Sequence, residues 1–422
     1  MNQHCIICGA GLPEPLFSAE NMPAGAQVMP SPEEIAAGND RGISLSLCRC
    51  PVCGLTQFDC EPVTYYKKVI RAVGLSPTMR QLRRDDYRHL IEAYGMGGGK
   101  WIECGCGNGD FLQVLREFPV DIYATEADPG NVSAARLQLA APLPKADDMG
   151  NSAADPCMPG VSEAAVPPDY IMEFFPDRAD MDIPGAPFDV FLSFNFLEHQ
   201  PDPVSMLRCL HRNLAEGGIG LITVPSFEYI LQEGRYYELV RDHIANYDLP
   251  ALVYLCEYCG FEVLEKGYIG IGDTLRVVVK KAAYNSNISK LKDIQRDYFI
   301  LDKNYNRIKT LIQDYMNRLR TEGRRIAMWG ASHQGFTIAA TTALKDEVCY
   351  IIDSAGFKQG RFSPASHLPI VSPDYYLTHP VDVILIAAPG YIREIEATIR
   401  RRYRDTAPGV PKICDLLDLK ER

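Results

Sequence analysis

The sequence lacks the features that carry a chain into a membrane or out of the cell. No stretch contains the roughly eighteen consecutive apolar residues that a membrane-spanning helix needs. Residues 1–25 lack the continuous apolar core of a signal peptide. We therefore expect a cytoplasmic protein in which the fourteen cysteines are reduced thiols, apart from any that bind metal.

An excess of positive charge is also missing. The net charge is −11 and the isoelectric point is near 5.3, which argues against a large surface for the phosphate backbone of a nucleic acid. Hydrophobic residues make up 46% of the chain and charged residues 23%, as in a globular protein. At 422 residues the chain is too long for one ordinary core, so we expect two or three domains.

A glycine-rich turn lies within Trp101–Leu112. A short apolar run leads into three closely spaced glycines, Gly105, Gly107 and Gly109, and an amphipathic segment follows. This order predicts a strand, a tight turn and a helix. Glycine lets the backbone approach a ligand closely, and the helix N-terminus offers free N–H groups. The same turn could instead be a steric corner between a strand and a helix.

Two acidic residues favour a cofactor at this turn. Glu103 precedes the first glycine, and Glu126 follows the next apolar run, where a carboxylate can hold ribose hydroxyls. The spacing Glu-x-Gly-x-Gly-x-Gly, followed by an acid at a strand end, resembles the S-adenosylmethionine (SAM) site of class I methyltransferases. A dinucleotide turn counted from Gly105 would need its third glycine where this chain has Asp110, so NAD is disfavoured.

Two Cys-x-x-Cys-Gly units predict a metal site near the N-terminus. Their cysteines are Cys5, Cys8, Cys50 and Cys53. Four thiolates complete a tetrahedral zinc shell, and such a site is closed and structural. Cys48 is a possible substitute ligand that ranks below Cys50. We expect Met22–Gly42, which is rich in proline, alanine and glycine, to loop out between the pairs, where it could contact a partner or substrate.

Polar residues follow the predicted buried strand Phe188–Phe194. Asn195, Glu198 and His199 lie at its C-terminal end. Ligands bind beside the carboxyl ends of strands in open α/β sheets, so a polar group there is worth more than one elsewhere. We expect His199 to be functional and Asn195 to contact the cofactor, although a histidine in a loop can also be purely structural.

The segment Glu228–Tyr247 is dense in polar and aromatic side chains, unlike a solvated helix, which would be richer in lysine and glutamate. Asp242 could orient or tune His243 as a general base. Tyr247 is a candidate contact to the substrate. The alternative for this segment is a capped surface helix.

A second α/β unit is expected in the last third of the chain, after an amphipathic connector helix at Leu291–Leu319. A strand leads into the turn Gly330–Gly335, and a helix and a second strand ending at Asp353 follow. Lys358 and Arg361 lie in the next loop, and their cationic side chains suit a phosphate.

With these motifs in place, the chain resembles the three-domain sugar C-methyltransferases, which act on nucleotide-linked keto-deoxysugars. The likeness covers nearly the whole length. It rests on the cysteine pairs, the glycine turn and the segments Glu198–Pro203, Leu275–Val277 and Lys358–Pro373.

The resemblance implies an α/β protein with a class I SAM-dependent methyltransferase core of Rossmann-like fold. A small zinc-binding domain would precede this core, and a Rossmann-like domain that helps to hold the nucleotide-sugar would follow it. The expected boundaries are 1–62, 63–282 and 283–422, with a surface insertion at about 142–168.

The resemblance also implies catalytic roles. In this family a base removes a proton from the carbon next to a ketone, and the enolate carbon attacks the SAM methyl group. His243 matches the base, and Asp242 replaces a glutamate beside it. His199 matches a histidine that stabilises the enolate oxygen.

Three features depart from the family pattern. Arg241, Asp242 and His243 stand where relatives have a His-Glu-His cluster, and a tyrosine expected near Arg71 has no clear counterpart. The insertion at about 142–168 is also foreign to the pattern. Two alternatives therefore stay open: a SAM-dependent O- or N-methyltransferase of another small metabolite, and a non-catalytic zinc-knuckle protein that binds nucleic acid or protein.

Overall fold

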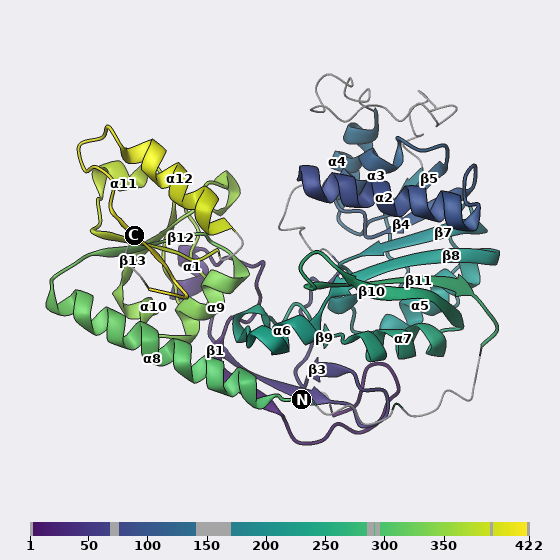
Figure 1. Ribbon diagram of the computed structural model, residues 1–422, viewed down its shortest axis with the longest axis horizontal. Helices are drawn as coiled ribbons and strands as arrows, with labels where there is room; N and C mark the ends of the chain where they lie inside the picture. Colours follow the sequence, from purple (N-terminus) through teal and green to yellow (C-terminus); the bar gives the residue numbers. More distant parts are fainter. Residues whose placement is uncertain are drawn as a thin grey trace.

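A computed structural model describes residues 3–67, 76–140, 170–284, 291, 296–388 and 391–419. Three β-sheets are present in this part of the chain, with four, seven and five strands. The seven-stranded and five-stranded sheets occupy separate lobes, and the N-terminal strands lie where the lobes meet (Figure 1). The expected insertion at 142–168 and the position of Arg71 lie outside the described residues. None of the described helices is long and apolar enough to cross a membrane.

The seven-stranded sheet has the order β10-β11-β8-β7-β4-β5-β6. Its strands are β4 (Lys100–Cys104), β5 (Asp121–Thr125), β6 (Ile171–Met172), β7 (Phe188–Phe194), β8 (Leu214–Pro225), β10 (Phe261–Ile269) and β11 (Thr274–Lys281). All are parallel except β11, which runs antiparallel to both of its neighbours. The strand order reverses between β4 and β7, so a ligand crevice is expected at the carboxyl ends of these two strands.

Helices cover both faces of this sheet (Figure 1). One face carries α2 (Pro77–Tyr94), α3 (Asp110–Leu115) and α4 (Pro129–Ala140), and the other carries α5 (Pro203–Asn213) and α7 (Leu249–Tyr258). Successive residues of β4 point to opposite cores, because Trp101 packs with Tyr87 while Ile102 belongs to the cluster that contains Leu207. Burial of each such side chain contributes roughly 1.5–3 kcal/mol, which holds the carboxyl edge of the sheet in place.

The four-stranded sheet joins the N-terminal segment to a much later part of the chain. Its strands are β1 (Phe17–Met22), β2 (Ile43–Arg49), β3 (Thr56–Phe58) and β9 (Ala245–Asn246), in that order. β9 pairs antiparallel with β3, and the Phe58 N–H donates to the Ile244 carbonyl at 3.2 Å. The residues that follow His243 are therefore held as an edge strand of the N-terminal sheet, which the sequence pattern did not indicate.

The stretch Met22–Gly42 contains the short helix α1 (Pro32–Ala36), which begins with a capping box between Ser31 and Glu34. Further along the stretch, the Asp40 carboxylate accepts hydrogen bonds from the Ala365 N–H at 2.6 Å and from His367 at 2.9 Å. The stretch is therefore tied to the C-terminal lobe.

The C-terminal lobe confirms the expected Rossmann-like α/β unit. Its sheet is entirely parallel, with the order β14-β13-β12-β15-β16. The strands are β12 (Ile326–Trp329), β13 (Val348–Ile352), β14 (Ile370–Val371), β15 (Val383–Ile386) and β16 (Lys412–Asp415). The expected connector helix is α8 (Phe299–Thr321), which begins at Phe299 and not at Leu291. The other helices are α9 (His333–Thr341), α10 (Leu344–Glu347), α11 (Tyr375–Thr378) and α12 (Ile392–Tyr403), with the 3-10 turn η5 (Gly356–Lys358).

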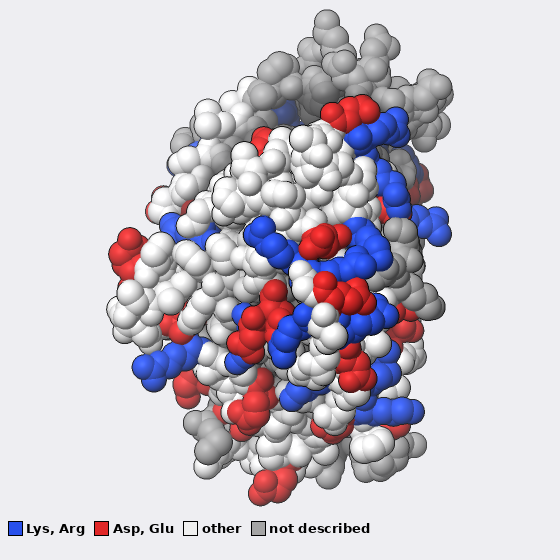
Figure 2. Space-filling model, turned by 90° about the vertical axis from the view of Figure 1, so that its left-hand side faces the viewer, with Lys and Arg blue, Asp and Glu red and all other residues white. Residues whose placement is uncertain are grey.

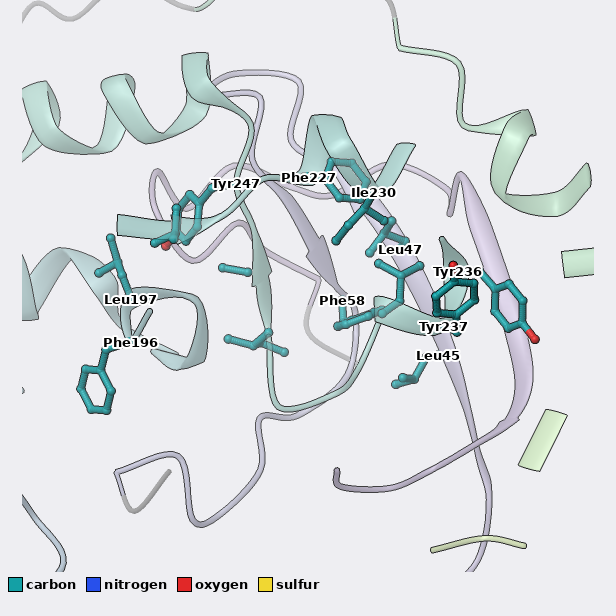
Figure 3. Close-up of a cluster of buried hydrophobic side chains, with 14 of the residues drawn as sticks. Leu45, Leu47, Phe58, Phe196, Leu197, Phe227, Ile230, Tyr236, Tyr237 and Tyr247 are labelled. Atoms are coloured by element: carbon teal, nitrogen blue, oxygen red, sulfur yellow. The ribbon is translucent and has the colours of Figure 1, made fainter. Parts of the chain in front are cut away.

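The lobes meet around α6 (Phe227–Glu233) and the 3-10 turn η4 (Tyr236–Glu238). Helix α9 packs against η4 and β1, and the Tyr236 hydroxyl lies 3.1 Å from that of Thr341. Figure 3 shows Tyr236 and Tyr237 beside Leu45 and Leu47 of β2 in one buried cluster. The N-terminal sheet, the segment before His243 and the C-terminal lobe thus share a core.

The charged surface is mixed in sign on the side that Figure 2 shows. Lysine and arginine side chains alternate there with aspartate and glutamate, and no large area carries positive charge alone.

Candidate active site

The predicted strand, turn and helix form the first part of the site. Gly105, Gly107 and Gly109 have φ values of +74°, +57° and +88°, in the left-handed region that favours glycine. A side chain at Gly105 would meet the Phe196 ring at 3.0 Å, and one at Gly109 would meet Ala135 at 3.0 Å. A side chain at Gly107 would enter open space. Two of the glycines thus permit packing, and Gly107 leaves its surroundings free for a ligand.

Glu126 closes the turn from the end of β5. Its carboxylate accepts hydrogen bonds from the N–H groups of Gly107 at 2.8 Å and Asp128 at 2.9 Å. Burial raises the pKa of Glu126, and these N–H donors oppose the increase. The buried Oδ1 atom of Asn108 has no hydrogen-bond partner among the described residues. Open space, a carboxylate and an unsatisfied polar atom fit a polar cofactor such as SAM.

The other two cofactor candidates differ in exposure. Glu103 is fully buried within β4 and interacts electrostatically with Arg83. Asn195 is exposed, has a φ of +49° and accepts a hydrogen bond from the Thr223 hydroxyl at 3.1 Å. β4 and β7 are parallel neighbours and Phe196 packs on Gly105, so Asn195 follows β7 at the same edge as the glycine turn.

His199 and His243 form the second part of the site. Their ring centroids lie 4.6 Å apart, with an angle of 78° between the planes. His199 ends the 3-10 turn η3 (Leu197–His199), which packs against β9. Burial lowers the pKa of His199 to about 4. Burial, together with His199 and His333, lowers the pKa of His243 well below its ordinary value. Both imidazoles are therefore neutral near pH 7, and each offers a lone pair.

Asp242 acts on His199 through its backbone. Its carbonyl oxygen lies 2.8 Å from Nδ1 of His199. Its carboxylate accepts hydrogen bonds from the Tyr65 hydroxyl at 2.8 Å and from the Ala26 N–H at 2.7 Å. The expectation that this carboxylate orients His243 is not what the contacts show, because both of its oxygens bind the N-terminal segment instead.

Arg241 binds the same segment. Its guanidinium donates to the carbonyls of Ala24, Glu61 and Pro62 at distances of 2.8–3.4 Å. A side chain at Gly25 would meet the Tyr65 hydroxyl at 2.3 Å, so glycine is needed where the two loops cross. The unusual Arg241–Asp242 pair therefore attaches the N-terminal loops beside His243.

Glu198 is the third polar group of the site; the sequence places it at the strand end with His199 but assigns it no role of its own. It is 2% exposed, and its Oε1 atom lies 3.9 Å from Nε2 of His199. Ligand atoms of Glu198, His199 and His243 all lie within 4.8 Å of one another. Burial raises the pKa of Glu198 to about 8. The signal in the sequence was its position directly before His199 at a strand end.

The candidate substrate contacts lie in different places. Tyr247 is 1% exposed, and its hydroxyl has no hydrogen-bond partner among the described residues. Lys358 lies in the C-terminal lobe, where its ammonium donates to the Ala331 carbonyl at 2.9 Å and lies 3.3 Å from the Asp353 carboxylate. Arg361 is exposed nearby. The contacts of Lys358 thus hold it at the Gly330 turn, beside the carboxyl ends of β12 and β13.

The four cysteines of the N-terminal pairs form a separate cluster. Cys5 and Cys53 lie 3.4 Å apart at sulfur, as do Cys8 and Cys50, and all four sulfurs lie within 4.8 Å of one another. The N–H groups of Ile7 and Val52 point to the sulfurs of Cys5 and Cys50. Cys48 is not part of this cluster. The arrangement fits a tetrahedral site for a metal that prefers thiolates.

Comparison with known families gives matches for two successive parts of the chain. Residues 79–266 match the family described as a methyltransferase domain. Residues 275–407 match the family described as a C-methyltransferase C-terminal domain.

Among curated proteins, the C-methyltransferase NovU of Streptomyces niveus is 24% identical over 211 residues, which are 47% of this chain and 50% of NovU. The ubiquinone biosynthesis O-methyltransferase of Pseudomonas aeruginosa strain UCBPP-PA14 is 26% identical over 155 residues, 34% of this chain and 56% of that protein. The chain thus spans about half the length of the curated relatives it matches.

Solved structures give a weaker likeness. Magnesium protoporphyrin IX methyltransferase from Synechocystis PCC 6803 with bound SAH, the demethylated product of SAM, is 13% identical. The match covers 48% of this chain and 83% of that one, with a TM-score of 0.35. A score of this size adds nothing to the assignment.

The sheet order, the glycine turn at the switch point and the first family match define the fold of a class I SAM-dependent methyltransferase domain. The second match is more particular, because it adds a C-methyltransferase C-terminal domain to this methyltransferase domain.

A substitution at Gly107 tests the cofactor turn. Gly107→Arg fills the open space beside Glu126, so we expect calorimetry to detect no SAM or SAH binding. Gly98→Arg is the matched control, since Gly98 also has positive φ (+74°) and open surroundings but lies outside the site. Both variants carry a backbone cost of roughly 1–2 kcal/mol, so their melting temperatures should fall together. Unchanged SAM affinity in Gly107→Arg would remove this turn from the cofactor site.

Proposed function

We propose that this protein transfers a methyl group from SAM to the carbon next to a ketone in a nucleotide-linked sugar. The observation that carries the proposal is the pair of neutral imidazoles, His199 and His243, at the strand edge that also holds the glycine turn. The C-methyltransferase C-terminal domain and the similarity to NovU support carbon as the methylated atom.

His243 is the proposed base. When bound, SAM supplies a methyl group activated by the positive sulfonium. Because the pKa of His243 lies well below its ordinary value, the imidazole is unprotonated and can accept the C–H proton. Its position is fixed by β9, which begins two residues later and pairs with β3.

His199 is proposed to meet the oxygen on which negative charge develops. Burial of the ring, which is 5% exposed, lowers the local dielectric constant and strengthens this interaction. Lys358 and Arg361, in the loop after β13, are the proposed contacts for the diphosphate of the nucleotide. Asn195 and Tyr247 remain proposed contacts of the cofactor and the substrate.

Exchange of the substrate proton tests the chemistry. In deuterated water, a keto-sugar nucleotide should exchange the proton next to its ketone in the presence of the protein and SAH, because only enolate formation releases that proton. His243→Ala should lower exchange and methyl transfer by roughly 10²–10⁴-fold while SAM affinity is retained. The exposed His379→Ala is the control and should keep the full rate.

The outcome also separates the two kinds of methyl transfer. Methylation of an oxygen or nitrogen without any exchange would contradict the proposal and favour an O- or N-methyltransferase. A nearly normal exchange rate in His243→Ala would exclude His243 as the base.

We also propose that the N-terminal cysteine cluster binds structural zinc. All four ligands come from the chain, so the site is closed, and the second pair lies directly before β3. Zinc would therefore stabilise the sheet that holds β9.

Elemental analysis of the purified protein tests this site. The wild type and Cys48→Ser should contain one zinc per chain, and Cys50→Ser should contain almost none, because Cys50 belongs to the cluster and Cys48 does not. Zinc retention in Cys50→Ser, or loss in Cys48→Ser, would contradict the assignment. Thermal unfolding should show a lower melting temperature for Cys50→Ser than for Cys48→Ser.

A further inference from the structure

The hydrogen bond of His199 limits what this residue can do alone. Nδ1 lies 2.8 Å from the Asp242 carbonyl oxygen, which can only accept, so the ring proton is on Nδ1. In a neutral imidazole Nε2 then carries a lone pair and no proton. A lone pair repels a developing oxyanion, so stabilisation of an enolate by Nε2 requires a second proton on the ring.

One carboxyl group is placed to supply that proton. Glu198 Oε1 lies 3.9 Å from Nε2 of His199, and Glu198 Oε2 is buried without a hydrogen-bond partner among the described residues. A buried carboxylate in this state would be costly, whereas a buried carboxylic acid is neutral. Neutral buried carboxyls of this kind serve as donors in other enzymes.

We propose that Glu198 holds a proton and passes it to Nε2 of His199 as the enolate forms. Glu198 is then the acid of the site and acts through His199. This inference rests on the proposed function. The O–H bond of Glu198 breaks with its electron pair left on the carboxylate, and an N–H bond forms at Nε2. His243 takes the C–H proton, and the electron pair of that bond becomes the enolate.

The charges balance at every stage. Before the reaction the pKa of about 8 at Glu198 and that of about 4 at His199 keep the proton on Glu198, and the negative charge that develops on the enolate oxygen raises the proton affinity of Nε2. The neutral set of substrate, Glu198, His199 and His243 becomes an enolate, a carboxylate and two imidazolium rings, with no net change. The 3.9 Å gap exceeds a hydrogen bond, so one bridging water or a small rotation of the Glu198 side chain completes the path. After methyl transfer, His199 returns its proton to Glu198, and His243 releases its proton to water.

The groups around Glu198 are compatible with a protonated carboxyl. Those that face the cluster are His199, His243, Tyr247, the Asp242 backbone and, through His243, His333. None of the residues that shift the pKa of Glu198 is a cation that would favour its carboxylate, and burial raises that pKa to about 8. The carboxyl is therefore protonated in the neutral range and loses its proton as the pH rises through about 8.

The pH profile of exchange tests the proposal. Wild-type exchange should fall as the pH rises above about 8, because Glu198 then has no proton to give. Glu198→Gln keeps the shape and neutrality of the acid but cannot release a proton. It should lower exchange by roughly 10²-fold at pH 7, remove the decline above pH 8 and keep SAM affinity. Glu228 is a buried glutamate that pairs with Arg296 outside the site, so Glu228→Gln should keep the wild-type pH profile of exchange.

Two measurements decide the point without turnover. The carboxylic-acid C=O band in the infrared spectrum at pH 7 should be weaker in Glu198→Gln than in the wild type. The unfolding free energy of the wild type should decrease relative to Glu198→Gln as the pH rises from about 4.5 to about 8, because the folded state binds the extra proton in that range.

The contrary results are equally definite. An unchanged pH profile or no difference in the infrared band would overturn the role of Glu198. A second bound metal ion, beyond zinc, that disappears in Glu198→Gln would show Glu198, His199 and His243 to be metal ligands and would also overturn it. Absence of exchange in the wild type, with the infrared difference present, would refute the proposed function but not the protonation of Glu198.

Discussion

The antiparallel pairing of β3 with β9 joins the N-terminal sheet to the segment that carries His243. β3 directly follows the second cysteine pair, and β9 directly follows His243. Two residues on each strand form the pair, and by itself such a short ladder is weak. It persists because Arg241 and Asp242 add side-chain hydrogen bonds to residues 24–26 and 61–65, and because Tyr236 and Tyr237 pack in one buried cluster with Leu45 and Leu47 of the same sheet. His243, the proposed base, is thus held in place by the N-terminal sheet.

Because of this attachment, different parts of the chain position different residues of the site. The seven-stranded sheet places the glycine turn, Glu126 and His199 along one edge, as its topology requires. His243 reaches that edge from a segment that the other two sheets hold, since η4 packs on α9 and β9 on β3. Residues 236–247 therefore contact all three parts of the molecule. A change in the N-terminal sheet or in the C-terminal lobe would displace the proposed base relative to the cofactor turn.

The sequence was sufficient for those features whose chemistry depends on spacing. Three glycines between a strand and a helix predict the turn, and two Cys-x-x-Cys-Gly units predict the cluster that excludes Cys48. It was insufficient where tertiary contacts decide. A two-residue strand such as β9 has no measurable periodicity, and nothing local shows that the Asp242 carboxylate binds Tyr65 instead of orienting His243. The role proposed for Glu198 follows only from its burial and from the fixed tautomer of His199. The domain boundaries and the roles of the site residues remain predictions.

The most direct test is a crystal structure of the protein with SAH and a nucleotide-linked keto-sugar. We predict that the carbon next to the ketone lies roughly 3–3.5 Å from a ring nitrogen of His243, with the ketone oxygen facing His199 and the diphosphate near Lys358. A sugar bound with a hydroxyl or amino group toward the sulfur of SAH, and with its ketone remote from both histidines, would contradict the account.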